Sequence, residues 1–219
     1  MSVITAIAFI DYKYNKEKIS QLRLCMKISA KVLTQGSIAS ANMLTPLKDL
    51  KVTKHLIPAH GLIPNTSIQN KPLMIYHRAF DPNSTSPSAI ESHFSSIGVV
   101  DPQWRYTMYS TSHFHSTSHE VLGIAAGEAK LCFGHEDNPK RVEEVLKKGD
   151  VIVMPAGVSH RLLDDISGGF SMVGAYPRGS SWDMCYGKKG EEDQVRNIEK
   201  LAWFKKDPVY GDQGPVLDV

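Results

Sequence analysis

The 219-residue chain has few cysteines, no long apolar run, no internal repeat and almost no net charge. Its three cysteines, Cys25, Cys132 and Cys185, form neither an even set nor a Cys-x-x-Cys pair, which argues against a disulfide framework or a thiol redox motif. The apolar opening VITAIAFI ends at Asp11, no basic segment precedes it, and no later run reaches the roughly 18 apolar residues of a membrane span. We therefore expect a soluble cytoplasmic protein that crosses no membrane.

The charge balance also excludes a class of partner. The formal net charge is +2, and the lysines are scattered rather than gathered in one stripe, so we expect no nucleic-acid partner. The length suits one domain with a full core plus a terminal extension.

Residues 1–52 differ in composition from the remainder, because they are basic and rich in serine, threonine and alanine. Two interpretations stay open. The segment is either a mitochondrial targeting segment, although its acidic residues fit that poorly, or a loosely packed extension with a helix near residues 14–33. In both cases we place the domain at residues 53–219.

Apolar patterning predicts the elements of that domain. Prolines and glycines punctuate residues 55–87, and the run LMIYHRAF among them predicts a strand. A short helix is expected to open at Ser86 and Pro87 and to stop at Gly98. After Trp104 come short apolar runs bounded by turn residues, which predict an all-β sandwich or barrel: YTMY, EVLGIA, AKLCF, VIVMP and FSMVGAY. A charged helix around residues 191–203 and a tail rich in glycine and proline follow.

The stretch HFHSTSHE carries the strongest chemical pattern. Alternate side chains of a strand face the same way, so His113 and His115 would project together from Cα atoms roughly 6.6 Å apart. Glu120 adds a carboxylate, and a downstream Pro-x-Gly turn would bring in His160 from a neighbouring strand. Three imidazoles and a carboxylate suit Fe, Mn, Ni, Cu or Zn better than Mg or Ca, which prefer oxygen ligands.

A second pattern in the same stretch competes with the first. His115 and His119 stand four residues apart, as they would on one face of a helix in zinc hydrolases. No glutamate follows His115, and hydroxyl and β-branched residues dominate, so we favour the strand. On a strand His119 faces away from Glu120, as a supporting or surface residue.

The two histidine elements resemble the paired motifs of the cupin superfamily. The first matches over residues 113–127, with Thr107 where a glycine is usual, and the second over residues 149–160, with Asp164 where an asparagine is frequent. Both departures concern turn geometry rather than ligands. In cupins the matching positions hold one metal at the mouth of the barrel, and the resemblance implies that role for His113, His115, Glu120 and His160.

The resemblance extends to a narrower group, the YjlB-like cupins, which are small single-barrel proteins. It covers roughly residues 55–219 and rests on PQWRYTMY, HSTSHEVLGIAAGEAKL, GDVIVMPAGVSHR, MVGAYPRG, WDMCYG and DPVYGDQGPVL. It implies a double-stranded β-helix barrel of the jelly-roll type with short flanking helices, and a homodimer. We place the barrel core at about residues 100–178 and the C-terminal helix and tail at 190–219.

Other residues near this pattern are candidates for substrate contact. By alternation from His113, Tyr109 and Thr111 should face the same interior. Tyr109 is our candidate catalytic residue, to position a substrate or donate a proton, with simple packing as the alternative. Arg105 and Tyr176 are candidate anchors for an anionic ligand, but we favour a structural role for both.

These observations predict a protein that binds one divalent transition metal, Fe, Mn, Ni or Zn, and a small oxygen-bearing organic substrate that chelates it. With iron the site would suit oxygenase chemistry, which we favour; with the other metals it would suit isomerisation or hydrolysis by Lewis-acid catalysis. The competing class is a non-enzymatic cupin that senses or stores a small ligand.

Overall fold

The computed structural model describes residues 43–219. The mitochondrial segment and the helix near residues 14–33 expected from the sequence lie outside the described residues, as does Cys25. Within them, Cys132 and Cys185 are free, buried thiols. No helix in this part of the chain is long and apolar enough to cross a membrane.

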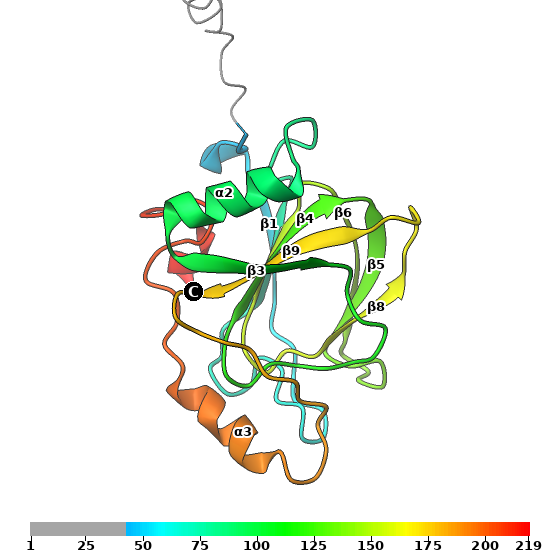
Figure 1. Cartoon of the computed structure of the whole chain (residues 1–219). Helices are drawn as coiled ribbons and strands as arrows, with labels where there is room; N and C mark the ends of the chain where they lie inside the picture. Colours follow the sequence, from blue (N-terminus) through cyan, green and yellow to red (C-terminus); the bar gives the residue numbers. More distant parts are fainter. Residues whose placement is uncertain (1–42) are drawn as a thin grey trace, which may run out of the picture. The chain divides into compact units, whose positions relative to one another are not determined.

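Nine strands and a few short helices make up the described chain (Figure 1). The strands are β1 (Lys51–His55), β2 (Leu73–His77), β3 (Val100–Tyr106), β4 (Glu120–Ala126), β5 (Glu128–Phe133), β6 (Val142–Lys147), β7 (Val151–Met154), β8 (His160–Asp164) and β9 (Ser171–Pro177). The α-helices are α2 (Pro87–Ile97) and α3 (Glu192–Asn197), and the 3-10 helices are η1 (Leu47–Asp49), η2 (Ile198–Lys200) and η3 (Pro215–Asp218).

The strands form two antiparallel sheets. The larger has the order β1-β2-β7-β4-β9-β3 and the smaller the order β6-β5-β8. Neighbours in the larger sheet are mostly distant in sequence, as in a jelly roll. This confirms the all-β barrel class expected from the short apolar runs.

The larger sheet is buried on both faces. Val121 and Val153 belong to one apolar cluster, whereas their neighbours Leu122 and Ile152 belong to another, because successive side chains of a strand point to opposite faces. The second cluster joins residues of both sheets and fills the space between them. Burial on both faces explains why the central strands are continuously apolar rather than alternating.

Helix α2 covers the outer face of the larger sheet (Figure 1). The Ser86 hydroxyl accepts the Ala89 N–H at its start, and Gly98 takes a left-handed φ of 70° at its end, as the sequence predicted. A Cβ on Gly123 of β4 would lie 2.7 Å from a methyl of Ile90, so this glycine lets the helix approach the sheet.

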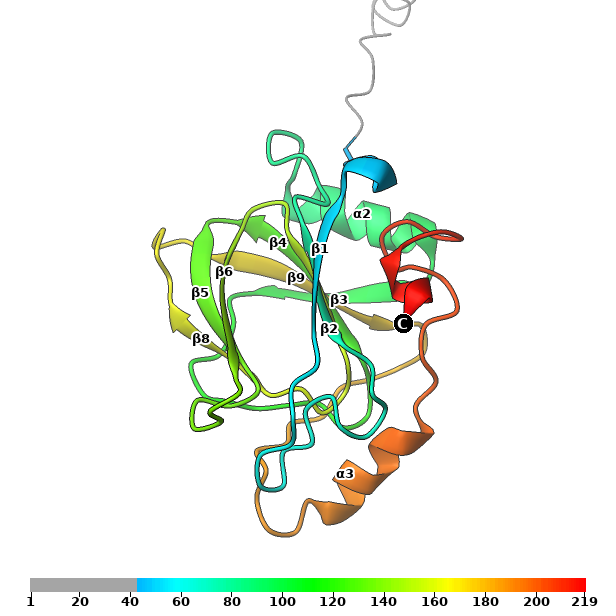
Figure 2. The same ribbon diagram turned by 180° about the vertical axis from the view of Figure 1, so that it is seen from behind.

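The C-terminal tail is tied to the same face, beside α2 (Figure 2). Asp207 is fully buried, and its carboxylate accepts a hydrogen bond of 2.7 Å from the Tyr76 hydroxyl of β2. The backbone N–H groups of Val209 and Tyr210 donate to its other oxygen, at 2.8 and 3.0 Å. The acid is therefore satisfied, and the tail is part of the domain.

Several element boundaries differ from the expected ones. The run YTMY is not a strand: β3 ends at Tyr106 and begins at Val100, across Pro102, which an edge strand accommodates because it needs no ladder donor there. The sequence VEEVLK of β6 was missed, because this exposed edge strand buries only Leu146. The helix expected at residues 191–203 is shorter, formed by α3 and η2.

Candidate metal centre

An extended three-residue stretch presents the first two histidines. Phe114 is fully buried in a third apolar cluster and exchanges two backbone hydrogen bonds of 2.9 Å with Cys185. His113 exchanges backbone hydrogen bonds of 3.3 and 2.9 Å with His160, the first residue of β8. With Phe114 pointing to one side, the imidazoles of His113 and His115 point to the other, as alternation predicted.

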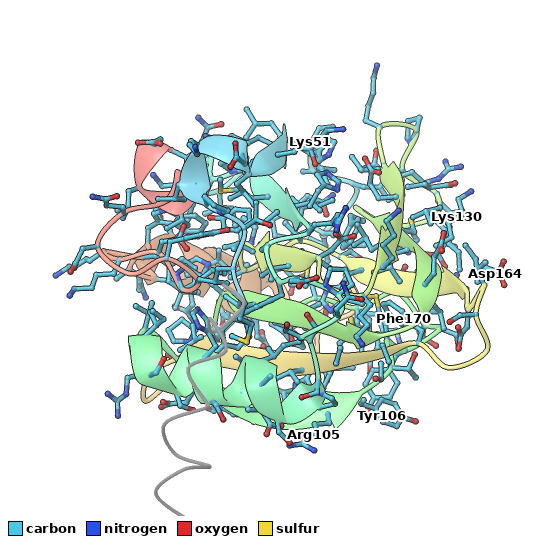
Figure 3. The ribbon with its side chains drawn as sticks, turned by 90° about the horizontal axis from the view of Figure 1, so that it is seen from above. Lys51, Arg105, Tyr106, Lys130, Asp164 and Phe170 are labelled. Carbon is cyan, nitrogen blue, oxygen red and sulfur yellow. The ribbon has the colours of Figure 1, made fainter. Side chains whose placement is uncertain are left out.

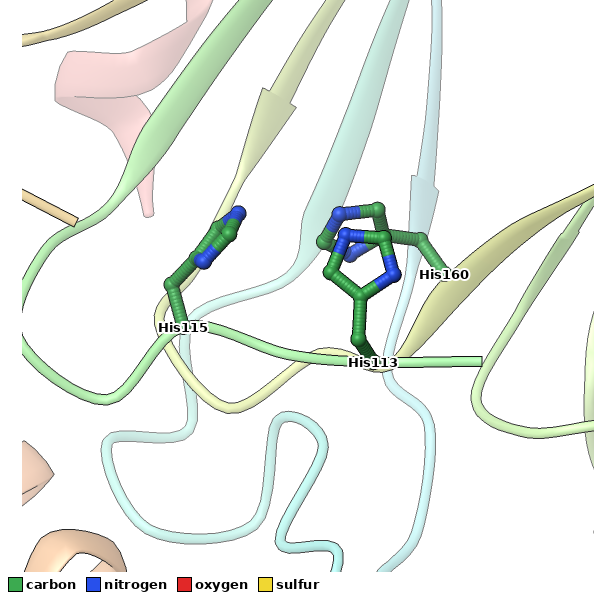
Figure 4. Close-up of side chains that lie close together, drawn as sticks. All are labelled: His113, His115 and His160. Carbon is green, nitrogen blue, oxygen red and sulfur yellow. The ribbon is translucent and has the colours of Figure 1, made fainter. Parts of the chain in front are cut away.

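The three imidazoles converge (Figure 4). One nitrogen from each of His113, His115 and His160 lies within 4.8 Å of the others, and all three side chains are buried. The ring centroids of His113 and His160 are 4.2 Å apart, and those of His115 and His160 are 5.3 Å apart. Such spacing lets three nitrogens reach one ion, whose bonds to nitrogen are about 2.0–2.1 Å for zinc.

Backbone carbonyls fix which ring nitrogen faces the centre. The Nδ1 atom of His113 lies 2.9 Å from the Thr111 carbonyl oxygen, that of His160 lies 3.0 Å from the Val158 oxygen, and that of His115 contacts the Asp183 oxygen. A carbonyl only accepts, so each Nδ1 carries the proton and donates. Each Nε2 then presents a lone pair, as metal-binding histidines do.

Glu120, the first residue of β4, lies beside two of the three histidines. Its Oε1 atom lies 3.6 Å from His115 Nε2 and its Oε2 atom lies 3.6 Å from His160 Nε2. The side chain is buried, and Oε2 has no hydrogen-bond partner among the described residues. A buried carboxylate oxygen without a donor is costly, so this atom fits the place of a metal ligand.

Electrostatics favour an ionised Glu120 and neutral His113 and His160, whereas His115 is favoured in its protonated form until a metal displaces that proton. Although burial opposes its charge, Glu120 has its pKa lowered to about 2, chiefly by His115. Burial lowers the pKa of His113, and lowers that of His160 well below its usual value. Burial acts in the same direction on His115, but the neighbouring Glu120 raises its pKa overall. An ionised carboxylate and neutral imidazoles suit a divalent transition metal.

Tyr176 and Arg105 each form hydrogen bonds with a glutamate side chain of the protein. The Tyr176 hydroxyl donates to Glu120 Oε1 over 2.5 Å, so it supports a candidate ligand rather than an outside anion. The Arg105 guanidinium pairs with both oxygens of Glu91 on α2, so it is engaged as well. Arg105 and Tyr106 lie at the outer edge of the molecule, at the end of β3 (Figure 3).

A cavity of about 260 Å³ opens beside the histidines. Its walls are mostly aromatic and thioether side chains, namely Trp104, Tyr106, Met108, Tyr109, Met172, Tyr176, Trp182 and Met184. Tyr109 is half exposed at this wall, its ring edge-on to that of His113 with centroids 5.5 Å apart. Thr111 does not line the cavity. Its carbonyl holds His113 instead.

His119 belongs to a different environment. It is buried, its Nδ1 accepts the Ala156 N–H at 3.0 Å, and its ring packs edge-on against Trp203 with centroids 4.9 Å apart. A supporting role fits this position, and a surface position is wrong. Residues 115–119 are not helical, which excludes the helical pairing of His115 with His119.

Sequence reasoning missed three contributors to the site. Asp183 holds His115 through its carbonyl and accepts the Ser116 N–H at 2.7 Å through its carboxylate. Trp182 packs edge-on against His115 with ring centroids 5.7 Å apart. Thr107 lines the cavity, and its hydroxyl is buried without a partner among the described residues. For Asp183 and Trp182 the segment WDMCYG held the only signal, and nothing local in it indicates contact with His115.

Comparisons with known proteins find related sequences. A model of the cupin family matches residues 109–163. The uncharacterized protein YjlB of Bacillus subtilis (strain 168) is 34% identical over 166 residues, which cover 75% of this chain and 94% of that protein.

Solved structures show weaker likeness. Acireductone dioxygenase from Bacillus anthracis, with a cadmium ion in its active centre, is 18% identical with a TM-score of 0.32, over 45% of this chain and 63% of that one. RmlC from Streptococcus suis, in complex with dTDP-D-xylose, is 13% identical with a TM-score of 0.31, over 62% and 72%. The chain thus spans less than two thirds of the dioxygenase.

Proposed function

We propose that this chain, which belongs to the YjlB-like cupins, is an enzyme that uses one divalent transition metal to transform a small oxygen-bearing organic substrate, with oxygenase chemistry as the first choice. The observation that carries the proposal is the convergence of three Nε2 lone pairs and an unpartnered Glu120 oxygen beside a cavity. A bound metal would supply Lewis acidity and, where redox-active, activation of dioxygen.

We assign the metal to His113, His115, His160 and Glu120. Three nitrogens and one oxygen suit Fe, Mn, Ni or Zn. In a six-coordinate ion four protein ligands leave two positions open, and His113, His115 and Glu120 also line the cavity, so a substrate there could reach them.

The walls of the cavity favour a particular substrate class. They are aromatic and thioether groups, and Arg105, the only lysine or arginine among the described lining residues, is already paired with Glu91. Beside the metal, a small dianion would find no unpaired lysine or arginine among these lining residues. We therefore propose a substrate with an apolar or aromatic body and two adjacent oxygen atoms. The Tyr109 phenol at the cavity wall would orient it and would donate or accept a proton.

Metal content and oxygen consumption test the proposal together. Protein reconstituted with Fe, Mn, Ni or Zn should hold close to one ion per chain by elemental analysis. The iron form should consume dioxygen with an aromatic diol more readily than with oxalate. Absence of bound metal after every reconstitution would sink the proposal. Ligands that raise the melting temperature and are recovered unchanged would indicate a binding or sensing protein instead.

We further propose a homodimer, as the family resemblance implies. Light scattering on a size-exclusion column should give twice the chain mass of 24.3 kDa. A mass of one chain would contradict it.

A further inference from the structure

We propose that Tyr176 is a positioning residue that makes Glu120 a one-oxygen metal ligand, by occupying Oε1 and leaving Oε2 for the ion. The inference rests on the metal-binding part of the proposed function. It concerns the hydrogen bonds around a single carboxylate, which decide how that carboxylate can meet a metal.

The direction of each hydrogen bond follows from the chemistry of the donors. The Trp104 indole Nε1 lies 2.9 Å from the Tyr176 oxygen, and an indole N–H can only donate. The Tyr176 oxygen therefore accepts from Trp104, and its own proton is directed to Glu120 Oε1, 2.5 Å away.

The two carboxylate oxygens of Glu120 are consequently unequal. Oε1 has a strong donor, since hydrogen bonds to ionised groups are about twice as strong as neutral ones. Oε2 has no donor among the described residues and lies 3.6 Å from His160 Nε2, whereas Oε1, which lies 3.6 Å from His115 Nε2, already accepts from Tyr176. A metal bound at Oε2 would satisfy that oxygen without disturbing the bond to Tyr176.

Neighbouring elements hold Tyr176 in this position. β9 pairs with β4 in a register that places Val121 opposite Ala175, so Tyr176 lies next to Glu120 across the two strands. The Trp182 ring stacks on Tyr176 with an interplanar angle of 22°. The Trp104 indole rests on Gly174, where a Cβ would lie only 2.0 Å from the ring. Packing and strand pairing therefore hold Trp104, Tyr176 and Glu120 in the positions that their hydrogen bonds require.

Removing the hydroxyl would change how the carboxylate binds. In Tyr176→Phe, Oε1 loses its donor inside a buried site, and leaving a charged group unpaired there is costly. The nearest positive charge would be the metal, so we expect the carboxylate to turn both oxygens towards it. Metal affinity should fall by ten- to hundredfold, the usual effect of losing an outer partner of a ligand.

Cobalt(II) gives a readout that a structural role would not move. Full-length wild-type protein and Tyr176→Phe are titrated with Co²⁺, and the visible absorption and dissociation constant are measured. Raising the coordination number of cobalt weakens its visible bands, so Tyr176→Phe should show lower intensity as well as weaker binding. Trp104→Phe, which keeps the tyrosine but removes the donor that directs its proton, should give a smaller change.

The chain offers a matched control. Tyr76 is another fully buried tyrosine whose hydroxyl donates to a buried carboxylate, that of Asp207, at 2.7 Å and away from the histidines. Tyr76→Phe should lower the melting temperature and leave the cobalt spectrum and affinity unchanged.

The outcomes separate the two ideas. Wild-type protein that takes up no Co²⁺ overturns the metal-binding proposal itself. Wild-type binding with Tyr176→Phe unchanged in spectrum and affinity, or changed only as Tyr76→Phe is, overturns the role of Tyr176 alone. Should Tyr176→Phe not fold, Trp104→Phe decides: a shifted spectrum supports the inference and an unchanged one contradicts it.

Discussion

The second nitrogen of each histidine decides what the first can do. His113, His115 and His160 each donate a hydrogen bond from Nδ1–H to a backbone carbonyl oxygen. The fold, rather than a bound metal, therefore sets their tautomer. Glu120 is oriented in the same way, because the Tyr176 hydroxyl donates a hydrogen bond to one of its carboxylate oxygens. The hydrogen bonds that orient these four side chains are therefore formed by the protein alone.

Substitutions at His160 and at its neighbour Arg161 should have different effects on metal binding. His160→Ala should lower metal affinity by at least ten- to hundredfold, because a direct ligand matters at least as much as an outer partner. Arg161→Ala should keep the metal, since the Arg161 guanidinium pairs with Glu136 at 2.5 Å. Equilibrium dialysis with Zn²⁺ measures both. Equal losses in the two variants would contradict the assignment.

His119 should prove structural. His119→Ala should retain the metal and lose about 2–4 kcal/mol of stability, because it leaves a cavity beneath Trp203 and an unpaired Ala156 N–H. Urea unfolding of the metal-free variant measures the cost. An empty metal site in this variant, with His160→Ala still loaded, would reverse the roles.

The same residue predicts a dependence on pH. Burial lowers the pKa of His119 to about 4, so below its unfolded value near 6.5 the unfolded chain binds a proton that the folded chain refuses. Stability contributed by neutral His119 should be complete above pH 6.5 and fall by about 3 kcal/mol as pH drops to 4. Metal-free His119→Ala should lose less stability over this interval, and an equal loss in both proteins would exclude the effect.

At the scale of elements, the turn before β8 aligns the two histidine segments. Gly157 has φ of 90°, and its N–H donates to the His115 carbonyl at 2.9 Å. A Cβ there would lie 2.8 Å from the Pro64 ring. This glycine thus joins the segment of His115 to the strand that starts with His160.

Gly157→Ala should lose about 1–3 kcal/mol of stability and weaken metal binding, through strain and the contact with Pro64. Gly168→Ala is the control, because Gly168 also has a positive φ, 68°, but nothing lies within 4 Å of its Cβ position. It should lose about 1 kcal/mol and bind metal normally. Thermal melts and zinc titrations compare them. Equal metal affinities would show that the turn does not align the ligands.

The N-terminal boundary is a second prediction at this scale. Met43, Leu44 and Leu50 pack against the cluster under α2, and the Thr45 N–H donates to the Ala79 carbonyl at 2.9 Å. A chain starting at residue 43 should fold and bind metal as the full chain does, whereas one starting at residue 51 should melt at lower temperature. Differential scanning calorimetry checks both. Identical melts would place the boundary near residue 52.

For the whole molecule, the metal should act as a stabilising ligand. An ion that binds only the folded state at a free concentration 100 times its dissociation constant adds about 2.7 kcal/mol. The ligands come from the stretch of residues 113–115, from β4 and from β8 of the smaller sheet, so the ion would join both sheets. EDTA treatment should lower the melting temperature and Zn²⁺ should restore it. His160→Ala should respond to neither.

The sequence by itself determined the class of the fold and the identity of the cluster. Short apolar runs predicted β2, β4, β5, β7 and β9, Ser86 and Gly98 predicted the ends of α2, and alternation predicted that His113 and His115 point together, because each depends on local backbone geometry. His160 was added to the cluster by the second motif and the resemblance to cupins. An edge strand such as β6 escaped, since it buries a single side chain and leaves little periodic signal.

Only the tertiary structure decided what surrounds the cluster. Tyr176 and Trp104 meet Glu120 through the pairing of β9 with β4 and β3, and Asp183 reaches His115 from 68 positions along the chain. These partners are set by strand order and register, for which no local spacing exists. The sequence could therefore name the side chains that converge, while the fold determines which of their hydrogen bonds are made.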